Sequence, residues 1–201
     1  MNNKVYEVAF EVSGPAAIFA RPDTGSAPVS YPVPTRSALI GMLEAVVRMR
    51  SSYLNPYKVE ICAPLVFHRY MTNYFGPLKP SNVKNQQITA MVLSNVCYKV
   101  YAKAEEVTEA PGRNNHLHAL QEIFQRRLHR GEFYTTPYLG WREFTPTYFG
   151  ELRAETHPLE DINIMIPSML YSVFEEPGSG KVAPIFRHFV EVRKGVLLYD
   201  E

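Results

Sequence analysis

The alternation of apolar and polar residues predicts strands over most of the chain. Between residues 5 and 12 every second side chain is apolar, and the acidic Glu7 and Glu11 fall on the other face. This period of two is that of a half-buried strand. Similar patterns predict further strands at 57–67, 92–103, 135–144 and 163–174, and a closing pair around Lys194-Gly195.

Two segments have the period of a helix instead. Thr35 is the predicted N-cap of a helix that runs to about Arg50 with apolar residues at helical spacing. Asn114 or Asn115 is predicted to cap a second helix that ends at Gly131. The outward face of this second helix carries three arginines that either keep the surface solvated or meet a partner: Arg126, Arg127 and Arg130.

A long polar segment separates two of the predicted strands. Residues 70–90 are rich in Asn, Gln, Pro and Lys, and the segment is far longer than a tight hairpin needs. We therefore expect a projecting, functional loop. A second loop, EEPGSGK at 175–181, lacks the glycine spacing of a phosphate-binding loop and is predicted to be a turn.

The predicted order is strand, helix, strand, strand, helix, strand. This is the split βαβ arrangement of ferredoxin-like domains. The sequence therefore predicts an α+β fold with a ferredoxin-like domain at 1–145 and a β-rich C-terminal extension at 146–201 packed on it. A fold alone does not give a function.

Composition excludes several classes of protein. With 201 residues, 46% of them apolar and 20% charged, the chain buries a sizeable core and is neither disordered nor a disulfide-stapled miniprotein. The 21 basic and 20 acidic residues nearly cancel, so any site for a polyanion has to be a local patch. Apolar stretches are too short for a membrane span, and the N-terminus alternates, so we expect a soluble, cytoplasmic protein without a membrane partner.

No metal or cofactor site is predicted. Cys62 and Cys97 stand in strand-like apolar surroundings without metal-ligand spacing, and we expect buried thiols. His116 and His118 are two residues apart, so on a helix they point about 200° away from each other and do not share an ion. Signatures of serine nucleophiles, Walker loops and dinucleotide-binding glycine motifs are absent.

Three segments together resemble the CRISPR-associated Cas5 family, part of the RAMP superfamily. They are GPAAIFARPDTGSAPVSYPVPTRSALIGMLEAVV at 14–47, VLSNVCYKVYAKAE at 92–105 and EIFQRRLHRGEFYTTPYLGWREF at 122–144. They cover about 70 of the 201 residues and occur in the family's order. No single segment suffices, but the three in sequence are specific.

The resemblance implies a subunit of a type I interference (Cascade) complex in antiviral defence or RNA-guided DNA targeting. Its fold would be a ferredoxin-like, RRM-related domain with an extended thumb hairpin at about 68–90 and a small β-rich C-terminal part. Its role would be to grip the 5′ repeat-derived handle of CRISPR RNA and to contact the large subunit and the first backbone subunit. Target DNA would be reached only indirectly.

The resemblance leaves open whether the protein cuts RNA. Members of type I-C systems are metal-independent endoribonucleases, a chemistry that needs a base, a cation and an acid. In those members a Lys-His pair opens the second helix and an aromatic residue lies near the end of the first. Counted without gaps from GWREF, these positions hold Ala119, Leu120 and the aliphatic pair Val46-Val47.

We therefore assign no catalytic residue and expect a non-cutting, type I-B-like subunit. The alternative is a type I-C-like processing nuclease, in which a small gap brings His116 or His118 into the catalytic position. A third hypothesis is a ferredoxin-like domain with protein partners only.

Binding a single-stranded handle needs cations for phosphates and flat groups for bases. We expect Trp141 and Arg142 to point to opposite faces of a strand. Trp141 is more typical of a core residue, and Arg142 is the better candidate for a contact with RNA. Solvated surface residues are the alternative at the charged positions. The candidates lie at the first helix start, in the thumb, in the 135–144 strand and before the last strands: Tyr31, Arg36, Ser37, His68, Arg69, Lys79, Lys84, Trp141, Arg142, Arg187 and His188.

Overall fold

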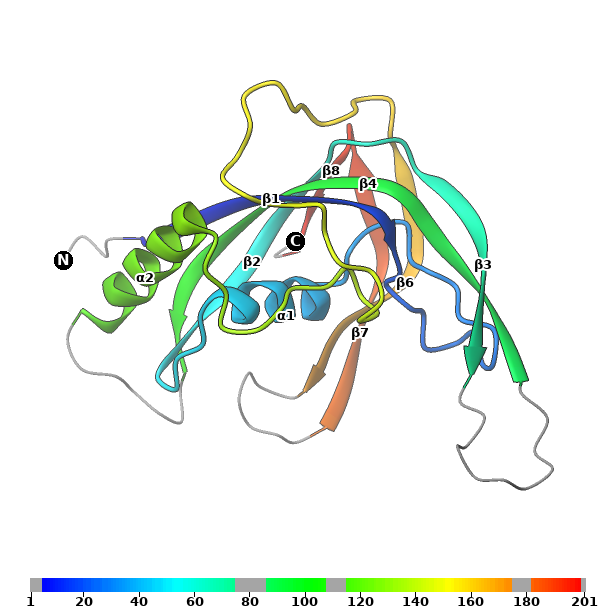
Figure 1. The fold of residues 1–201 in the computed structure, drawn as a ribbon, viewed down its shortest axis with the longest axis horizontal. Helices are drawn as coiled ribbons and strands as arrows, with labels where there is room; N and C mark the ends of the chain where they lie inside the picture. The colour runs from blue at the N-terminus through cyan, green and yellow to red at the C-terminus, as the bar shows by residue number, and fades with distance from the viewer. Residues whose placement is uncertain (1–4, 75–85, 108–114, 175–181, 200–201) are drawn as a thin grey trace.

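The computed structural model describes residues 5–74, 86–107, 115–174 and 182–199, which form two helices and one curled sheet (Figure 1). The helices are α1 (Arg36–Val46) and α2 (His116–Arg130). The strands are β1 (Glu7–Ala17), β2 (Ser52–Ile61), β3 (Val66–Tyr74), β4 (Gln86–Glu106), β5 (Tyr148–Gly150), β6 (Ile164–Phe174), β7 (Val182–Arg193) and β8 (Val196–Leu198).

The strands pair in the order β5-β1-β4-β2-β8-β7-β6, and β3 pairs with β4 beside this path. Every one of these pairings is antiparallel. Leu39 of α1 and Phe124 of α2 join Phe10 of β1 and Tyr98 of β4 in one buried cluster, so both helices cover the same face of the sheet. The fold is therefore mostly β, with two helices packed against a curled sheet. None of the described helices is long and apolar enough to cross a membrane.

The helix boundaries follow the predicted capping signals closely. Thr35 Oγ1 accepts a hydrogen bond from Ala38 N at 3.1 Å, as expected of an N-cap. The helix ends at Val46 rather than near Arg50, because Val47 turns to extended backbone and leads into β2. In α2 the N-cap is Asn115, although its side chain makes no capping bond, and Gly131 closes the C-terminus at φ 65°.

The loop that polarity predicts at 70–90 is a paired hairpin in its described parts, 70–74 and 86–90, as the family resemblance implies for the thumb. Tyr70 pairs with Ala90 and Thr72 with Ile88, so β3 and β4 form a long hairpin. Its polar side chains are compatible with strands because one face of this hairpin is open to solvent, as the exposed Arg69 and Met71 show. The single strand predicted at 57–67 is divided into the end of β2 and the start of β3.

The strand predicted at 135–144 is also wrong. Leu139 N donates to Phe144 O at 2.7 Å and Phe144 N to Trp141 O at 3.0 Å, which closes a compact turn. Gly140 has φ 97°, and a Cβ placed there would lie 1.7 Å from Ile18 O. The turn thus packs backbone to backbone against the end of β1, an arrangement that only glycine permits. The predicted strand at 163–174 is confirmed as β6, and the turn at Lys194-Gly195 joins β7 to β8.

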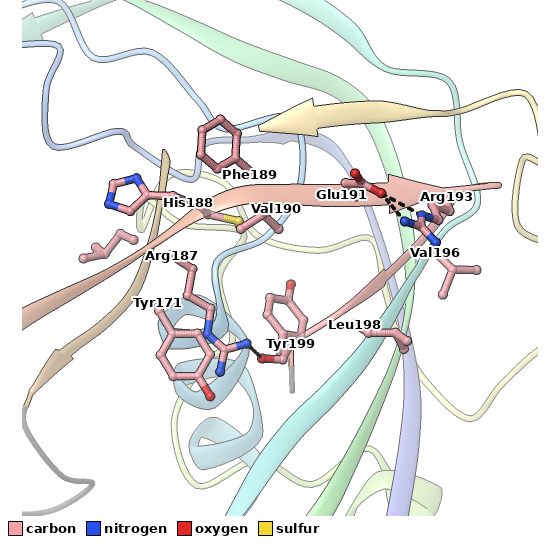
Figure 2. A pocket seen from close by; sticks show the side chains of 12 residues that line it. Tyr171, Arg187, His188, Phe189, Val190, Glu191, Arg193, Val196, Leu198 and Tyr199 are labelled. Carbon is pink, nitrogen blue, oxygen red and sulfur yellow. Dashed lines mark hydrogen bonds and ion pairs between the residues drawn. The ribbon is translucent and has the colours of Figure 1, made fainter. Parts of the chain in front are cut away.

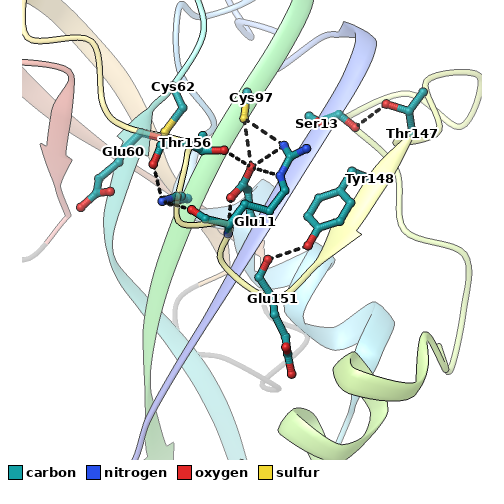
Figure 3. Close-up of polar contacts among 11 residues, drawn as sticks. Glu11, Ser13, Glu60, Cys62, Cys97, Thr147, Tyr148, Glu151 and Thr156 are labelled. Atoms are coloured by element: carbon teal, nitrogen blue, oxygen red, sulfur yellow. Dashed lines mark hydrogen bonds and ion pairs between the residues drawn. The ribbon is translucent and has the colours of Figure 1, made fainter.

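A strap of irregular chain at 151–163 crosses the outer face of the sheet (Figure 1). It is anchored by Glu11 of β1, which is 0% exposed and accepts hydrogen bonds from Arg153 and Thr156 (Figure 3). Lys99 of β4 donates to the carbonyl oxygens of the same two strap residues at 2.8 and 2.5 Å. The strap connects β5 to β6, so these bonds hold the start of the β6-β7 hairpin to the central strands β1 and β4.

Candidate nucleic-acid interface

Strands β6, β7 and β8 enclose a pocket of about 480 Å³ (Figure 2). Apolar side chains alternate in its wall with guanidinium, imidazole and phenol groups. The pocket is lined by Met169, Leu170, Tyr171, Arg187, His188, Phe189, Val190, Glu191, Arg193, Val196, Leu198 and Tyr199.

Two guanidinium groups lie over one phenol ring at this pocket. Arg187 Cζ is 4.0 Å from the centre of the Tyr171 ring, and Arg36 Cζ is 4.8 Å from the same point. Both distances are within the range of cation–π attraction. Arg187 of β7 pairs with Met169 of β6, which makes Tyr171 its diagonal neighbour across the hairpin. We call Arg36, Tyr171 and Arg187 the guanidinium-phenol cluster.

Arg36 is held in place by a chain of buried and half-buried polar groups. It is the first residue of α1 and is 6% exposed. Its Nε and Nη2 donate to Asn55 Oδ1 at 2.9 and 2.6 Å, and Asn55 Nδ2 donates to Glu105 Oε1 at 2.8 Å. Tyr53 Oη donates to Glu105 Oε2 at 2.7 Å, and burial, reinforced by this carboxylate, raises the pKa of Tyr53. These hydrogen bonds fix the position of Arg36 within the guanidinium-phenol cluster.

Arg187 is oriented from the C-terminal end of the chain. It donates a hydrogen bond to the carbonyl oxygen of Tyr199, whose own hydroxyl donates to Pro34 O at 2.6 Å. Tyr199 is buried, and burial raises the pKa of its phenol well above the usual value. The pocket floor is therefore tied to the segment that leads into α1.

The rim of the pocket presents exposed flat groups. His188 is exposed, and the Phe189 ring is 72% exposed. Phe189 has φ 55°, a left-handed conformation that costs a bulky residue about 1–2 kcal/mol. Its partner position in the hairpin is Pro167, which has no N–H to donate. A strained, exposed aromatic residue beside a pocket is typical of a binding site.

The candidates Tyr31, Arg36, Ser37, Arg187 and His188 converge on this hairpin. Tyr31 is only 3% exposed, and its hydroxyl accepts a hydrogen bond from Leu170 N at 3.1 Å. Ser37 Oγ donates to Tyr171 O at 3.2 Å. Tyr31 and Ser37 thus support β6 from beneath, while Arg187 and His188 line the pocket. Their contact with RNA stays a prediction.

The other described candidates form a second group around Phe144. Trp141 is half-buried and stacks on Phe144 with ring centres 5.9 Å apart, and Tyr70 of β3 meets the same ring edge-on at 5.3 Å. The exposed His68 and Arg69 precede Tyr70 on β3, and Arg142 is exposed in the turn. Lys79 and Lys84 lie outside the described residues.

The remaining polar features of α2 are mostly structural or solvated. Arg127 Nη1 donates to Val46 O at 2.8 Å, so this arginine links the two helices, while Arg126 and Arg130 are exposed. His116 Nε2 lies 3.6 Å from Glu106 Oε1, and His118 Nε2 lies 3.6 Å from Glu122 Oε1. The two histidines therefore have different carboxylate partners. Within the described ranges no group of three His, Cys, Asp or Glu residues is arranged to hold a metal ion.

Sequence reasoning missed Tyr171, Phe189 and Tyr199. Tyr171 and Tyr199 lie in apolar strand patterns in which an aromatic residue is typical of a core. Phe189 carries a weak signal, since it follows Arg187 and His188 and completes a cation-aromatic run. The convergence of these residues depends on strand pairing and not on local sequence.

A family model and a similar known protein both point to the same protein family. The family model Cas_Cas5d, described as CRISPR-associated protein (Cas_Cas5), matches residues 7–163. The chain is 33% identical over 208 residues to a Thermus thermophilus protein named CRISPR pre-crRNA endoribonuclease Cas5d, covering 93% of this chain and 88% of that protein.

Solved structures share the fold. A CRISPR-associated protein superposes with a TM-score of 0.71 at 20% identity, covering 96% of this chain and 90% of the other. A chain of a CRISPR RNA-guided surveillance complex superposes with a TM-score of 0.56 at 16% identity, covering 95% and 90%.

Proposed function

Because the chain belongs to the Cas5 family of CRISPR-associated proteins, we propose that it binds the 5′ handle of CRISPR RNA at the β6-β7-β8 pocket. The observation that carries this proposal is Arg187 over the Tyr171 ring in the pocket, with the buried Arg36 behind that ring, together with the exposed Phe189 at the rim. An unpaired base needs a flat face to stack on, and its phosphate needs a nearby cation. The pocket offers both within one hairpin.

The near-zero net charge of +1 favours a local mode of binding. Without a general positive field, affinity has to come from a patch such as Arg187 and His188 and from partner subunits. We infer that the isolated chain binds RNA weakly and that the assembled complex binds it well. The large subunit and the first backbone subunit are the partners we propose, with target DNA reached through the complex. The surveillance complex among the solved structures is consistent with such an assembly.

The pairing order supports a ferredoxin-like unit within the sheet. The order β5-β1-β4-β2, antiparallel throughout and with α1 and α2 on one face, is that expected of a split βαβ domain. We infer that this unit extends to Gly150, five residues past the boundary predicted at 145. The β3-β4 hairpin would then be the thumb.

Binding is tested with the assembled complex, measuring the dissociation constant for handle RNA at several salt concentrations. A lost charge-assisted hydrogen bond costs about 1.5–3 kcal/mol, so Arg187→Gln should weaken binding by roughly 10–100-fold. The salt slope should fall by about one. Phe189→Ala removes a stacking surface and should weaken binding by roughly 5–100-fold with an unchanged salt slope.

Lys194→Gln is the matched control for Arg187→Gln. It removes one positive charge from the turn that follows β7, where Lys194 is exposed and pairs with Glu160 at 3.7 Å. We expect its affinity to stay within about twofold of the wild-type value, since Lys194 does not line the pocket. Normal affinity in folded Arg187→Gln and Phe189→Ala variants would remove this pocket from the RNA path.

Cleavage of precursor CRISPR RNA is a second candidate function, favoured by the name of the Thermus relative. The ungapped comparison that predicts a non-cutting, type I-B-like subunit sets a catalytic position at Leu120, which is 1% exposed in the core. A side chain there does not reach RNA, which favours a shifted register. His116, with a side chain 15% exposed beside Glu106, then becomes the candidate base at the start of α2.

Incubation of the protein with its cognate repeat hairpin in EDTA separates the two functions. A metal-independent nuclease leaves a product ending in a 2′,3′-cyclic phosphate, and His116→Ala or His118→Ala should abolish it. A loss of about 10²–10⁴-fold is expected for a positioned general base. Background cleavage in the wild type would support the non-cutting subunit.

A further inference from the structure

Both cysteines of the chain lie opposite each other at the base of the β3-β4 hairpin. The β2-β4 register pairs Ile61 with Tyr98, and one step further Cys62 N donates to Cys97 O at 2.8 Å. Ile61 N instead bonds Gly195 O on the other side of β2, so Cys62 and Cys97 stand opposite each other and are joined by this one backbone hydrogen bond. The Cα atoms of opposed antiparallel residues are about 4.5–5.5 Å apart, within the range that a disulfide spans.

The two thiols share a face of the sheet with charged groups (Figure 3). Cys97 Sγ lies 3.5 Å from Glu11 Oε1 and 4.0 Å from Arg153 Nη2. Both cysteines are reduced and neither is fully buried, contrary to the buried thiols predicted from sequence. Cys97 is therefore a partly exposed residue whose sulfur atom lies beside a guanidinium group.

The two sulfur atoms have different chemical roles. A hydrogen bond from the Cys62 thiol lowers the pKa of Cys97, and the Arg153 guanidinium lowers it further, against the opposing effects of burial and Glu11. The same hydrogen bond, together with burial, raises the pKa of Cys62. Cys62 Sγ also lies 3.7 Å from Glu60 O, so its one proton has two acceptors. Because Arg153 lies beside Cys97 while Glu60 O accepts the proton of Cys62, we assign Cys97 as the nucleophile and Cys62 as the resolving thiol.

We propose that Cys62 and Cys97 form a reversible oxidation site, at which a hydroperoxide oxidises Cys97 and a disulfide to Cys62 then closes the base of the hairpin. This site is independent of RNA binding at the pocket. In the first step the Cys97 thiolate attacks one peroxide oxygen, the O–O bond breaks, and the leaving hydroxide takes a proton to become water. Cys97 is then a sulfenic acid.

In the second step the Cys62 sulfur attacks the Cys97 sulfur. The S–S bond forms, the S–O bond breaks, and the leaving hydroxide takes the Cys62 proton as water. Two thiols and one hydrogen peroxide thus give one disulfide and two waters. The bond closes the loop 62–97, which contains β3 and the first part of β4, and a thiol reductant reverses it.

Peptide mapping of the wild-type chain tests the proposal without any substitution. The native protein is treated with hydrogen peroxide, alkylated and digested with trypsin, which releases Cys62 in peptide 59–69 and Cys97 in peptide 85–99. We expect one linked species of these two peptides, lighter by two hydrogen atoms and separated again by dithiothreitol. Two unlinked, freely alkylated peptides, or a link between two copies of the chain, would overturn it.

The order of the two steps is tested by rates and by serine variants. The native protein should react roughly tenfold faster than the chain unfolded in urea, where the influence of Arg153 on Cys97 is lost. Cys62→Ser keeps a hydroxyl donor and should stop at a Cys97 sulfenic acid that dimedone traps. Cys97→Ser should react at least about tenfold more slowly than the wild type. Equal rates for Cys97→Ser and the wild type would overturn Cys97 as the nucleophile.

Discussion

Replacing Glu11 by Gln should be among the most destabilising single changes of charge in this protein. The Glu11 carboxylate is 0% exposed and accepts hydrogen bonds from Arg153 N at 2.9 Å, Arg153 Nε at 2.8 Å and Thr156 Oγ1 at 3.0 Å (Figure 3). Glutamine keeps the length of the side chain, but it loses the charge and turns an NH₂ group toward these donors. The strap at 151–163 would lose its central anchor.

The magnitude follows from the burial of the two partners. Breaking a buried ion pair costs about 3–5 kcal/mol, while an exposed pair contributes less than about 1 kcal/mol. The Arg153 side chain is 37% exposed, so solvent screens part of the pair and the lower end of the first range applies. We expect Glu11→Gln to lower the free energy of unfolding by about 3 kcal/mol, or the thermal midpoint by about 6–12 °C.

Equilibrium unfolding in urea, followed by circular dichroism at pH 7, measures this loss. Glu155→Gln is the matched control, because it removes the same charge from an exposed position of the same strap and should stay within about 0.5 kcal/mol. In a double-mutant cycle with Arg153→Met the two losses should be less than additive. A loss below about 1 kcal/mol for Glu11→Gln, with an unchanged m value, would refute the anchoring argument.

Three further measurements test separate parts of the structure. Burial alone would raise the pKa of Glu11, but hydrogen bonds from Arg153 and Thr156 hold it below its usual value. The stability that Glu11 confers should therefore be complete above about pH 4.3 and lost as the pH falls below it. A constant difference in the free energy of unfolding between wild type and Glu11→Gln from pH 7 to pH 3 would contradict this. Gly140→Ala should lower the stability by at least about 3 kcal/mol, because the added Cβ would overlap Ile18 O. Gly25→Ala, which has open space around it, should lower the stability by only about 1–2 kcal/mol in thermal unfolding. Equal losses of stability would count against the close contact between Gly140 and Ile18. Thr35→Ala should cost about 1 kcal/mol in urea unfolding and Thr35→Ser almost nothing, and equal losses would exclude the cap.

The elements predictable from sequence are those whose signals are local. Thr35 begins α1 and Gly131 ends α2 because a cap and a left-handed turn depend on neighbouring residues only. The alternation in β1 and β6 identified both strands for the same reason. Polarity alone predicts a loop in place of the β3-β4 hairpin, because its register joins residues up to 28 positions apart, from Val66 to Ser94, and its polar outer positions resemble a loop.

The candidate site was predictable only in part. Arg36 and Arg187 stand out in the sequence as cations at element boundaries, yet nothing local indicates that they meet over Tyr171. That meeting requires α1 to pack beneath the β6-β7 hairpin. The sequence predicts a strand at 135–144 where the structure has a turn, because the close contact of Gly140 with Ile18 is a tertiary feature.

The structure also separates residues that report on RNA binding from residues that report on folding. Arg36 is 6% exposed and is bound to Asn55, so reversing its charge would disturb the core before any RNA is present. Phe189 is 72% exposed, and its side chain can be removed with little loss of burial. A defect in handle binding is therefore evidence for the pocket when it arises from Phe189→Ala, whereas the same defect in an Arg36 variant follows equally from a displaced α1.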